Sequence, residues 1–195
     1  MKINDEINIA AISPQSEIYG PGNRFVIWVQ GCSIACPGCW NPQMHSHDQK
    51  KMVSIHDLVS MIEAQSDIEG ITILGGEPLE QCHSVLSLVQ EVKALNYTVV
   101  LYSGFEPEEI QTSNEKLLVQ SADIVIIGRY REELRSTHLL WRGSTNQQVQ
   151  FHNEHYRRIY NGLSEMNQAE IHISKDGHIT ITGYPDQYLL NEVLS

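Results

Sequence analysis

Residues 24–39 read RFVIWVQGCSIACPGC, an apolar run that leads into a loop with three cysteines. The run Arg24–Gln30 is β-branched and aromatic, and it predicts a strand. Cys32, Cys36 and Cys39 follow with the spacing CxxxCxxC. Thiolates are soft ligands that suit iron–sulfur clusters or zinc, and a 4Fe-4S cluster normally takes four of them. Three close cysteines would leave one iron open to a substrate or cofactor, so the first hypothesis is a catalytic cluster.

Zinc is the alternative ligand for the cysteine loop. The three cysteines together with His45 or His47 could make a closed Cys3His site. Zinc sites are more often built from two separated cysteine pairs, which favours the cluster. If neither histidine binds metal, both are expected on a polar surface after the loop.

Outside this stretch, short apolar runs alternate with helical patterns. This order implies right-handed crossovers and a mostly parallel α/β sheet covered by helices. The chain length fits a partial, open (β/α) barrel better than a complete eight-fold one. The predicted strands are Ile71–Leu74, Thr98–Tyr102 and Ile124–Ile127, and the predicted helices are Ser54–Ala64, Leu79–Leu95 and Glu108–Val119.

The last part of the chain has a different pattern. Glu170–Ser174 and His178–Thr182 both alternate apolar and polar residues, and Asp176-Gly177 between them predicts a β-hairpin. No internal repeat or linker marks a second domain. We therefore expect one domain over residues 1–195, in which residues 151–195 form a C-terminal extension with the hairpin.

The composition predicts a cytoplasmic protein whose partners are proteins or small molecules. In 195 residues the formal net charge is −11, which argues against general affinity for nucleic acid phosphates. No apolar run is long enough to cross a membrane, and residues 1–11 lack the core of a signal peptide. Only Cys82 lies outside the cysteine loop, so a second cluster is excluded. We expect Cys82 to be a buried, unligated residue on a helix.

A second motif, Gly75-Gly76-Glu77-Pro78, comes directly after the predicted strand Ile71–Leu74. Two glycines at a strand end let a ligand approach the backbone. The exposed carbonyls and the Glu77 carboxylate can accept hydrogen bonds from an ammonium group. A plain strand-to-helix turn with Pro78 as the first helical residue is the alternative, and the motif alone does not exclude it.

Together, the cysteine loop and the glycine turn resemble those of the radical S-adenosylmethionine enzymes. The likeness is strongest to the activating proteins of anaerobic ribonucleotide reductase and the related glycyl-radical activases. It extends over most of the chain, and its last segment is typical of the activases rather than of radical enzymes at large. The matching segments are GPGNR at 20–24, QGCSIACPGCWN at 30–41, GGEP at 75–78, YSGF at 102–105, IGRY at 127–130 and WRGSTNQ at 141–147.

The resemblance implies a set of site residues. One 4Fe-4S cluster would be held at three irons by Cys32, Cys36 and Cys39, and S-adenosylmethionine would chelate the fourth iron. No side chain beyond the cluster and the cofactor is expected to be catalytic. Two positions depart from the family, since Ile34 stands where many members carry histidine and Trp40 where His or Tyr is usual. The residues expected to bind S-adenosylmethionine are Gly75, Gly76 and Glu77 at its methionine part, Ser103 and Gly104 as further candidates, and Trp40 against the cluster or the adenine.

The resemblance also implies an activity. Reductive cleavage of S-adenosylmethionine would yield a radical that removes hydrogen from a glycine of a partner, most naturally anaerobic ribonucleotide reductase. An external one-electron donor such as flavodoxin or ferredoxin would reduce the cluster. Two alternatives remain: a radical enzyme that modifies a peptide or small molecule, and a zinc-binding interaction module. Neither nucleic acid nor a membrane is expected as a partner.

Overall fold

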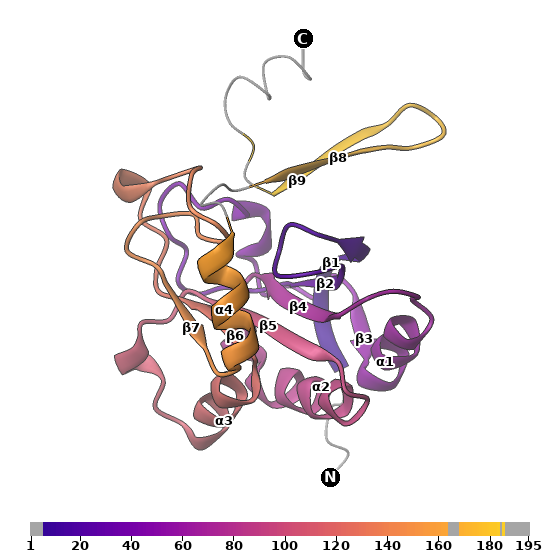
Figure 1. Ribbon diagram of the computed structural model, residues 1–195, viewed down its shortest axis with the longest axis horizontal. Coiled ribbons are helices and arrows are strands. Elements are labelled where there is room, and N and C mark those ends of the chain that lie inside the picture. The colour runs from indigo at the N-terminus through magenta and orange to yellow at the C-terminus, as the bar shows by residue number, and fades with distance from the viewer. Residues whose placement is uncertain (1–5, 164–167, 184, 186–195) are drawn as a thin grey trace.

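The computed structural model describes residues 6–163, 168–183 and 185, and its centre is a seven-stranded mixed sheet (Figure 1). The strands lie in the order β3-β1-β2-β4-β5-β6-β7. Four helices accompany the sheet: α1 Ile55–Glu63, α2 Cys82–Ala94, α3 Ser113–Ser121 and α4 Glu154–Gly162. The strands of the sheet are β1 Glu6–Ser16, β2 Arg24–Val29, β3 Met52–Ser54, β4 Gly70–Gly75, β5 Thr98–Ser103, β6 Ile124–Ile127 and β7 Gln148–Phe151.

The sheet has a parallel centre and antiparallel margins. Strands β2, β4, β5 and β6 pair in parallel, whereas β1 pairs antiparallel with β2 and with β3, and β7 pairs antiparallel with β6. The predicted α/β class and the four parallel strands are confirmed. The predicted partial barrel is not confirmed, because antiparallel strands flank the parallel series on both sides and the sheet ends at β3 and β7.

One face of the sheet is covered by α1, α2 and α3, which lie together on the lower side in Figure 1. Alternate residues of the strands, such as Phe25, Ile71 and Ile73, pack there with Leu58 and Leu88 of the helices in one large apolar core. Strand residues of the opposite phase point to the other face. That second face carries two smaller clusters under loops and α4.

Local capping sets where the helices begin. Ser54 is the N-cap of α1 and accepts a hydrogen bond from the Asp57 amide. The predicted helix Glu108–Val119 starts too early, because a capping box between Thr112 and Glu115 begins α3 at Ser113. A separate 3-10 turn precedes it at Pro107–Glu109.

The sequence patterns did not predict β1, β3, β7 or α4. Strand β1 contains Pro14 and its register with β2 shifts twice, between Ile9 and Ala11 and between Ser13 and Ser16. These irregularities break the simple alternation on which a strand prediction depends. Strands β3 and β7 have only three and four residues, which is too short for a periodic signal.

The predicted C-terminal hairpin is confirmed as β8 Ala169–Ile173 and β9 Ile179–Gly183, which project from the body of the molecule (Figure 1). Gly177 has the positive φ of a tight turn, at 82°. Other parts of the predicted extension, residues 164–167, 184 and 186–195, lie outside the described part of the chain. Among the described helices, none has the length and apolar character needed to cross a membrane.

Candidate functional site

The carboxyl ends of the parallel strands meet at one pocket of about 120 Å³. Loops after parallel strands lie at the same edge of a sheet, which is where α/β proteins usually place their sites. The pocket is lined by the cysteine loop after β2, the glycine turn after β4, the end of β5 and the long loop after β6. Its lining includes Cys32, Cys36, Cys39, Trp40, His45, Gly75, Gly76, Glu77, Tyr102, Ser103, Gly104, Tyr130, Gly143 and Gln147.

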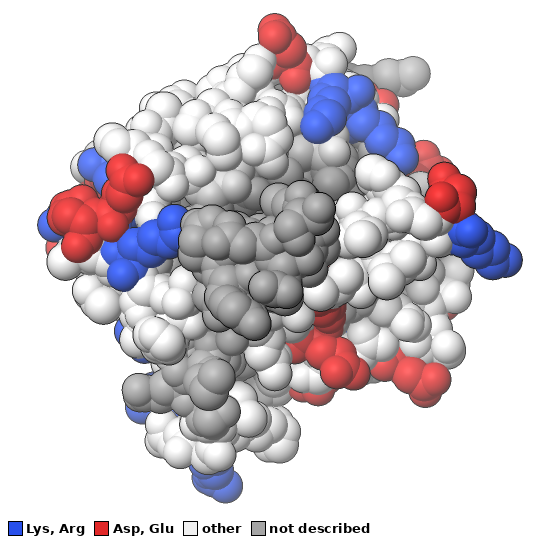
Figure 2. All heavy atoms as spheres, turned by 90° about the horizontal axis from the view of Figure 1, so that it is seen from above, with Lys and Arg blue, Asp and Glu red and all other residues white. Residues whose placement is uncertain are grey.

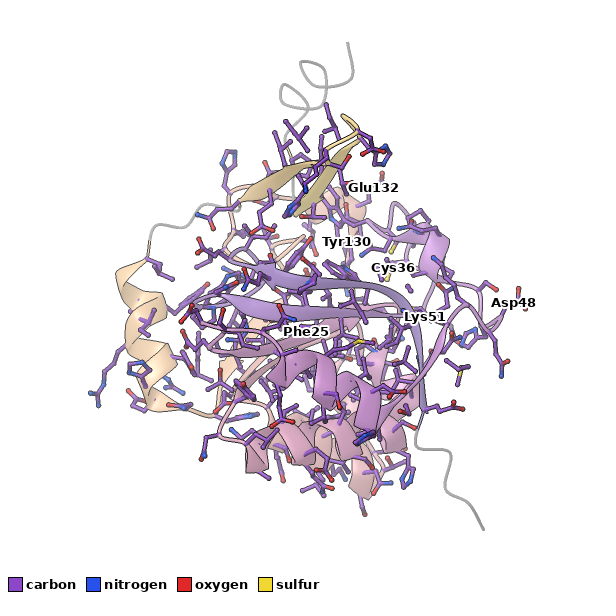
Figure 3. All side chains as sticks on the ribbon, turned by 90° about the vertical axis from the view of Figure 1, so that its right-hand side faces the viewer. Phe25, Cys36, Asp48, Lys51, Tyr130 and Glu132 are labelled. Carbon is purple, nitrogen blue, oxygen red and sulfur yellow. The ribbon has the colours of Figure 1, made fainter. Side chains whose placement is uncertain are left out.

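The three cysteines of the loop all line this pocket, and each is half-buried with a free thiol (Figure 3 labels Cys36 beside Tyr130). The loop is tied down by its own backbone, since the Cys32 amide donates to the His45 carbonyl at 3.0 Å and the Cys39 amide to the Cys36 carbonyl at 3.2 Å. Burial raises the pKa of the Cys32 and Cys36 thiols. A bound metal cation would favour their thiolate forms.

The glycine turn packs directly on the backbone of the cysteine loop. The Gly76 amide donates to the Val29 carbonyl and the Glu77 amide to the Gly31 carbonyl, both at 2.8 Å. A Cβ atom at Gly76 would lie 2.3 Å from the Gly31 carbonyl oxygen, and one at Gly75 2.8 Å from the Trp28 Cα. Gly75 also has a φ of 107°, which other residues rarely adopt. Both glycines are thus required for close contact between the two motifs.

The Glu77 carboxylate joins the glycine turn to the end of β5. It is only 1% exposed. Its Oε1 accepts hydrogen bonds from the Leu79 amide and the Ser103 hydroxyl at 2.9 Å, and its Oε2 accepts one from the Gly104 amide at 2.8 Å. Burial raises the pKa of Glu77 to about 7, although the three donors oppose this shift. The structure thereby brings together all the predicted residues of the glycine turn and of the β5 end.

The loop after β6 forms the opposite wall of the pocket. The Arg135 guanidinium lies 4.1 Å from the centre of the Trp40 ring, and Tyr130 meets the same ring edge-on at 6.4 Å. The Gln147 side chain closes the loop, since it accepts from the Gly143 amide at 2.9 Å and donates to the Gly128 carbonyl at 3.0 Å. The segment 141–147, which resembled the activases in sequence, therefore has a structural role as a wall.

Comparison with known proteins places this pocket in a family. A family model described as "4Fe-4S single cluster domain" matches residues 18–150. The anaerobic ribonucleoside-triphosphate reductase-activating protein of Enterobacteria phage T4 is 30% identical over 149 residues, which cover 73% of this chain and 93% of that protein. The chain belongs to the family of anaerobic ribonucleoside-triphosphate reductase-activating proteins. Members from Escherichia coli K12 and Haemophilus influenzae are 27% and 28% identical over 70% and 72% of this chain, and over 93% and 96% of their own lengths.

The range matched as a 4Fe-4S domain contains every residue that lines the pocket. The three cysteines of the loop lie within that range and line the same pocket. Among the residues that the structure describes, no three His, Cys, Asp or Glu side chains are gathered closely enough to hold a single metal ion. His47 contacts Glu80 at 2.7 Å and is largely exposed, as expected.

His45 differs from the expectation of a polar surface residue. It is half-buried and lines the pocket, and its Nε2 has no hydrogen-bond partner among the described residues. The buried Tyr130 hydroxyl in the same pocket also has none. Buried polar atoms are normally satisfied, so these two atoms fit a polar ligand beside the three sulfurs. The sequence named His45 only as an alternative zinc ligand, and Tyr130 reaches the pocket only through the fold.

Cys82 is not among the residues that line the pocket, and its predicted position on a helix is confirmed, although it is less buried than expected. It is the first residue of α2, is half-buried, and packs against the apolar core on the helix-covered face. Burial raises the pKa of its thiol to about 11. Cys82 is therefore a packing residue rather than a fourth thiolate ligand of the site.

Proposed function

We propose that this protein is a radical S-adenosylmethionine activase that generates a glycyl radical on anaerobic ribonucleoside-triphosphate reductase. The observation that carries this proposal is the pocket itself. Three thiols from one loop and a glycine turn that packs on that loop line a single cavity, in a chain of the reductase-activating family. The related proteins are named as activators of anaerobic ribonucleoside-triphosphate reductase, which supports the reductase as the partner.

The donor set suits one 4Fe-4S cluster with an open iron. Cys32, Cys36 and Cys39 would hold three irons, and the fourth cysteine is on α2. When bound and reduced, the cluster supplies one electron for cleavage of S-adenosylmethionine, whose fragment then removes hydrogen from the partner's glycine. The chain has only four cysteines, so it has no second cluster to deliver that electron. An external donor such as flavodoxin or ferredoxin fits this requirement.

The glycine turn would bind the methionine part of S-adenosylmethionine. Gly75 and Gly76 keep the backbone free of side chains at the pocket, and both are partly exposed there. The buried Glu77 carboxylate places negative charge directly behind this turn. An ammonium group at the turn would favour the ionised form of Glu77 and so lower its raised pKa. Glu77 thus acts both as a brace to Ser103 and Gly104 and as a counter-charge.

The aromatic wall would hold the remainder of the cofactor and exclude water. The Trp40 ring contacts both Arg135 and Tyr130, so these two residues help to position it before any ligand binds. Aromatic rings stack on nucleobases and exclude water from their neighbours. The adenine of S-adenosylmethionine against Trp40 would thereby complete the closure of the pocket on the side away from the glycine turn.

The test is made on anaerobically reconstituted protein reduced with dithionite. We expect conversion of S-adenosylmethionine to methionine and 5′-deoxyadenosine, measured by chromatography, and a glycyl radical on co-incubated reductase, measured by electron paramagnetic resonance. Cys36→Ala is expected to abolish both, because one of three thiolate ligands is lost. Cys82→Ala is the matched control and should retain the cluster spectrum and the cleavage.

Other results would contradict the proposal in different ways. Full cleavage by a variant without all three loop cysteines would remove the cluster from the mechanism. Cleavage by the native chain with no radical on the reductase would favour modification of another peptide or a small molecule. One zinc with no iron or sulfide after anaerobic purification would support an interaction module instead.

A further inference from the structure

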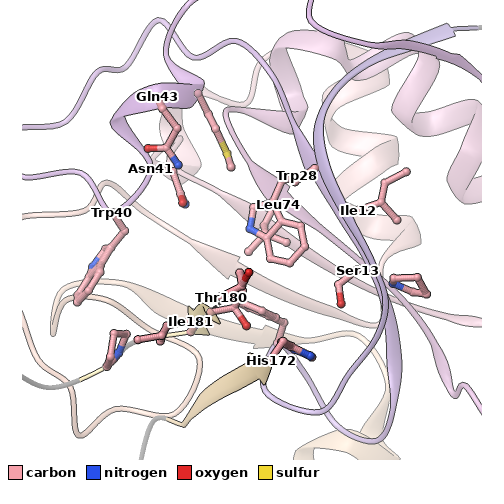
Figure 4. A pocket seen from close by; sticks show the side chains of 17 residues that line it. Ile12, Ser13, Trp28, Trp40, Asn41, Gln43, Leu74, His172, Thr180 and Ile181 are labelled. Atoms are coloured by element: carbon pink, nitrogen blue, oxygen red, sulfur yellow. Dashed lines mark hydrogen bonds between the residues drawn. The ribbon is translucent and has the colours of Figure 1, made fainter. Parts of the chain in front are cut away.

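A second and larger cavity, of about 650 Å³, lies between the sheet and the C-terminal hairpin. We call it the hairpin groove. Figure 4 shows Trp28 and Leu74 of the sheet on one side of it and Thr180 and Ile181 of the hairpin on the other. Its volume is in the range of cavities that bind sizeable ligands, about 300–1,000 Å³. The cluster pocket, at about 120 Å³, is much smaller.

The hairpin groove adjoins the cluster pocket. Trp40, Asn41 and Leu74 line both cavities. A polypeptide lying in the groove would therefore end beside the wall that faces the three cysteines. For a protein whose reaction takes place on a residue of another protein, such a path to the pocket is a functional requirement.

The hairpin is attached at its base and unpartnered at its tip. The Glu170 carboxylate accepts hydrogen bonds from the Ser16 hydroxyl and the Glu17 amide at 2.8 Å, and the Gly183 amide donates to the Tyr19 hydroxyl at 2.6 Å. Farther out, isoleucines pair across the strands on one face. Ile173 is 70% exposed, and Ile171 and Ile179 are each 43% exposed. A two-stranded ribbon with such a face is marginally stable alone and is typical of an interaction surface.

Figure 2 views the molecule from the side that bears the hairpin. Residues that the structure does not describe cover the centre of this view, and the Lys, Arg, Asp and Glu side chains visible in it lie around them. The hairpin also lies outside residues 18–150, the range matched by the family model.

We propose that the hairpin groove binds an extended segment of the reductase and directs it toward the cluster pocket, and that the isoleucine face of the hairpin, which the strand register turns away from the groove-lining His172 and Thr180, packs on the same partner. This inference rests on the proposed function, because it names where that same partner docks. The occupant is assigned to the reductase because the groove adjoins the cluster pocket and shares Trp40, Asn41 and Leu74 with it. The isoleucine face would bury its exposed area against the partner, and Trp28 and Leu74 would pack against the segment inside the groove.

The test separates docking from cofactor chemistry with two variants. Ile173→Ser removes the most exposed isoleucine of the tip, and Ser13→Trp places a large ring in the groove. Each is expected to raise the reductase concentration that gives half-maximal glycyl radical by about tenfold, as truncation at an interface hot spot does. Cleavage of S-adenosylmethionine without reductase should stay at the native rate. The matched control is Leu117→Ser on α3, where Leu117 is 45% exposed on the helix-covered side.

Each other outcome has a definite meaning. If both variants activate the reductase with native concentration dependence while the native protein is active, the docking surface is wrong and the proposed function stands. If Ile173→Ser converts a dimer to a monomer on sedimentation without changing activation, the hairpin binds a second copy of this chain, and the proposal is overturned. If the native protein forms no radical on the reductase, both the proposed function and the docking proposal fail.

Discussion

The two faces of the sheet are built differently, and neighbouring residues of β4 show the contrast. Ile73 points to the helix-covered face and belongs to a core that is apolar throughout. Leu74 points to the other face and lines both the cluster pocket and the hairpin groove. That second face also buries polar groups, among them Arg24 and Thr72. The comparison teaches that one face supplies stability by apolar burial, while the other combines smaller apolar clusters with polar networks and cavities.

The largest loss of stability is expected from substitution of Arg24. Such a loss would show that the face under the loops and α4 also contributes strongly to stability. Arg24 is 0% exposed. Its Nη2 donates to the Ile71 carbonyl at 2.7 Å, its Nη1 to the Pro21 carbonyl at 3.0 Å and its Nε to the Thr72 hydroxyl at 2.8 Å. Arg24→Met should cost about 4 kcal/mol of unfolding free energy, because several buried acceptors lose their donor. Urea denaturation of the cluster-free protein measures this loss.

The control for Arg24 is Arg157→Met on α4, where the side chain is more than half exposed and its ion pair with Glu154 is loose at 3.6 Å. We expect little change there, since exposed ion pairs contribute about 0–1 kcal/mol. Equal stability of the Arg24 and Arg157 variants would show that the second face of the sheet, under the loops and α4, does not depend on its buried polar network.

The next prediction compares the loss of stability at two neighbouring residues of β4 that point to opposite faces of the sheet. Ile73→Ala should destabilise the fold by about 3 kcal/mol, because it opens a cavity in the closely packed helix-covered core. Leu74→Ala should cost less stability, since Leu74 already borders two cavities. The order of the two losses in urea denaturation checks the assignment of the faces. A larger loss for Leu74→Ala would reverse the comparison.

The sequence predicted the parallel centre of the sheet because its strands are continuous apolar runs, such as 71–74 and 124–127, separated by helical periods. Buried parallel strands leave this signal regardless of their neighbours. It could not predict β1, whose Pro14 and register shifts depend on pairing with β2. The start of α3 had a local signal, the Thr112–Glu115 capping box, but the acidic residues after Pro107 looked equally helical.

The residues of the site also fall into two groups, those that a local sequence motif predicts and those that only the fold brings together. The cysteines and the glycine turn are contiguous motifs, so their chemistry could be interpreted before their positions were known. His45 and Tyr130 become pocket residues only when the chain folds. The bonds from Ser103 and Gly104 to Glu77 likewise join strand ends that are 26 and 27 residues apart in sequence. The family resemblance implied that these residues belong to one pocket, but it did not predict the contact between them.

A smaller effect on the unfolding free energy is expected from a change of pH, because the pKa of Glu77 differs between the folded and unfolded states. Its pKa is raised by burial from an ordinary 4.5 to about 7, so the folded state binds the proton more tightly than the unfolded state. The resulting stability is fully present below 4.5 and is lost as the pH rises through 7. We expect a decrease of about 2 kcal/mol between about pH 5 and about pH 8 in the cluster-free protein.

Two substitutions isolate this contribution of Glu77. Glu77→Gln cannot titrate, so its unfolding free energy should lose the decrease that the native protein shows over that range. Glu91→Gln, on the exposed side of α2, should keep the native pH dependence. A native-like pH profile in the Glu77 variant would mean that other groups cause the decrease.

The smallest effect is expected from a helix cap in the helix-covered layer, far from either cavity. The Ser54 hydroxyl accepts a hydrogen bond from the Asp57 amide at 3.1 Å and begins α1. Ser54→Ala should cost about 1 kcal/mol, because the amide at the helix start loses its acceptor. Ser60→Ala removes a hydroxyl from the middle of the same helix and should cost less, since Ser60 bonds only to the His56 carbonyl, an acceptor within the helix. If the helix-covered face serves stability alone, both variants cleave S-adenosylmethionine at the native rate at a temperature where each is folded. A reduced rate in the folded Ser54→Ala protein would instead couple this layer to the pocket.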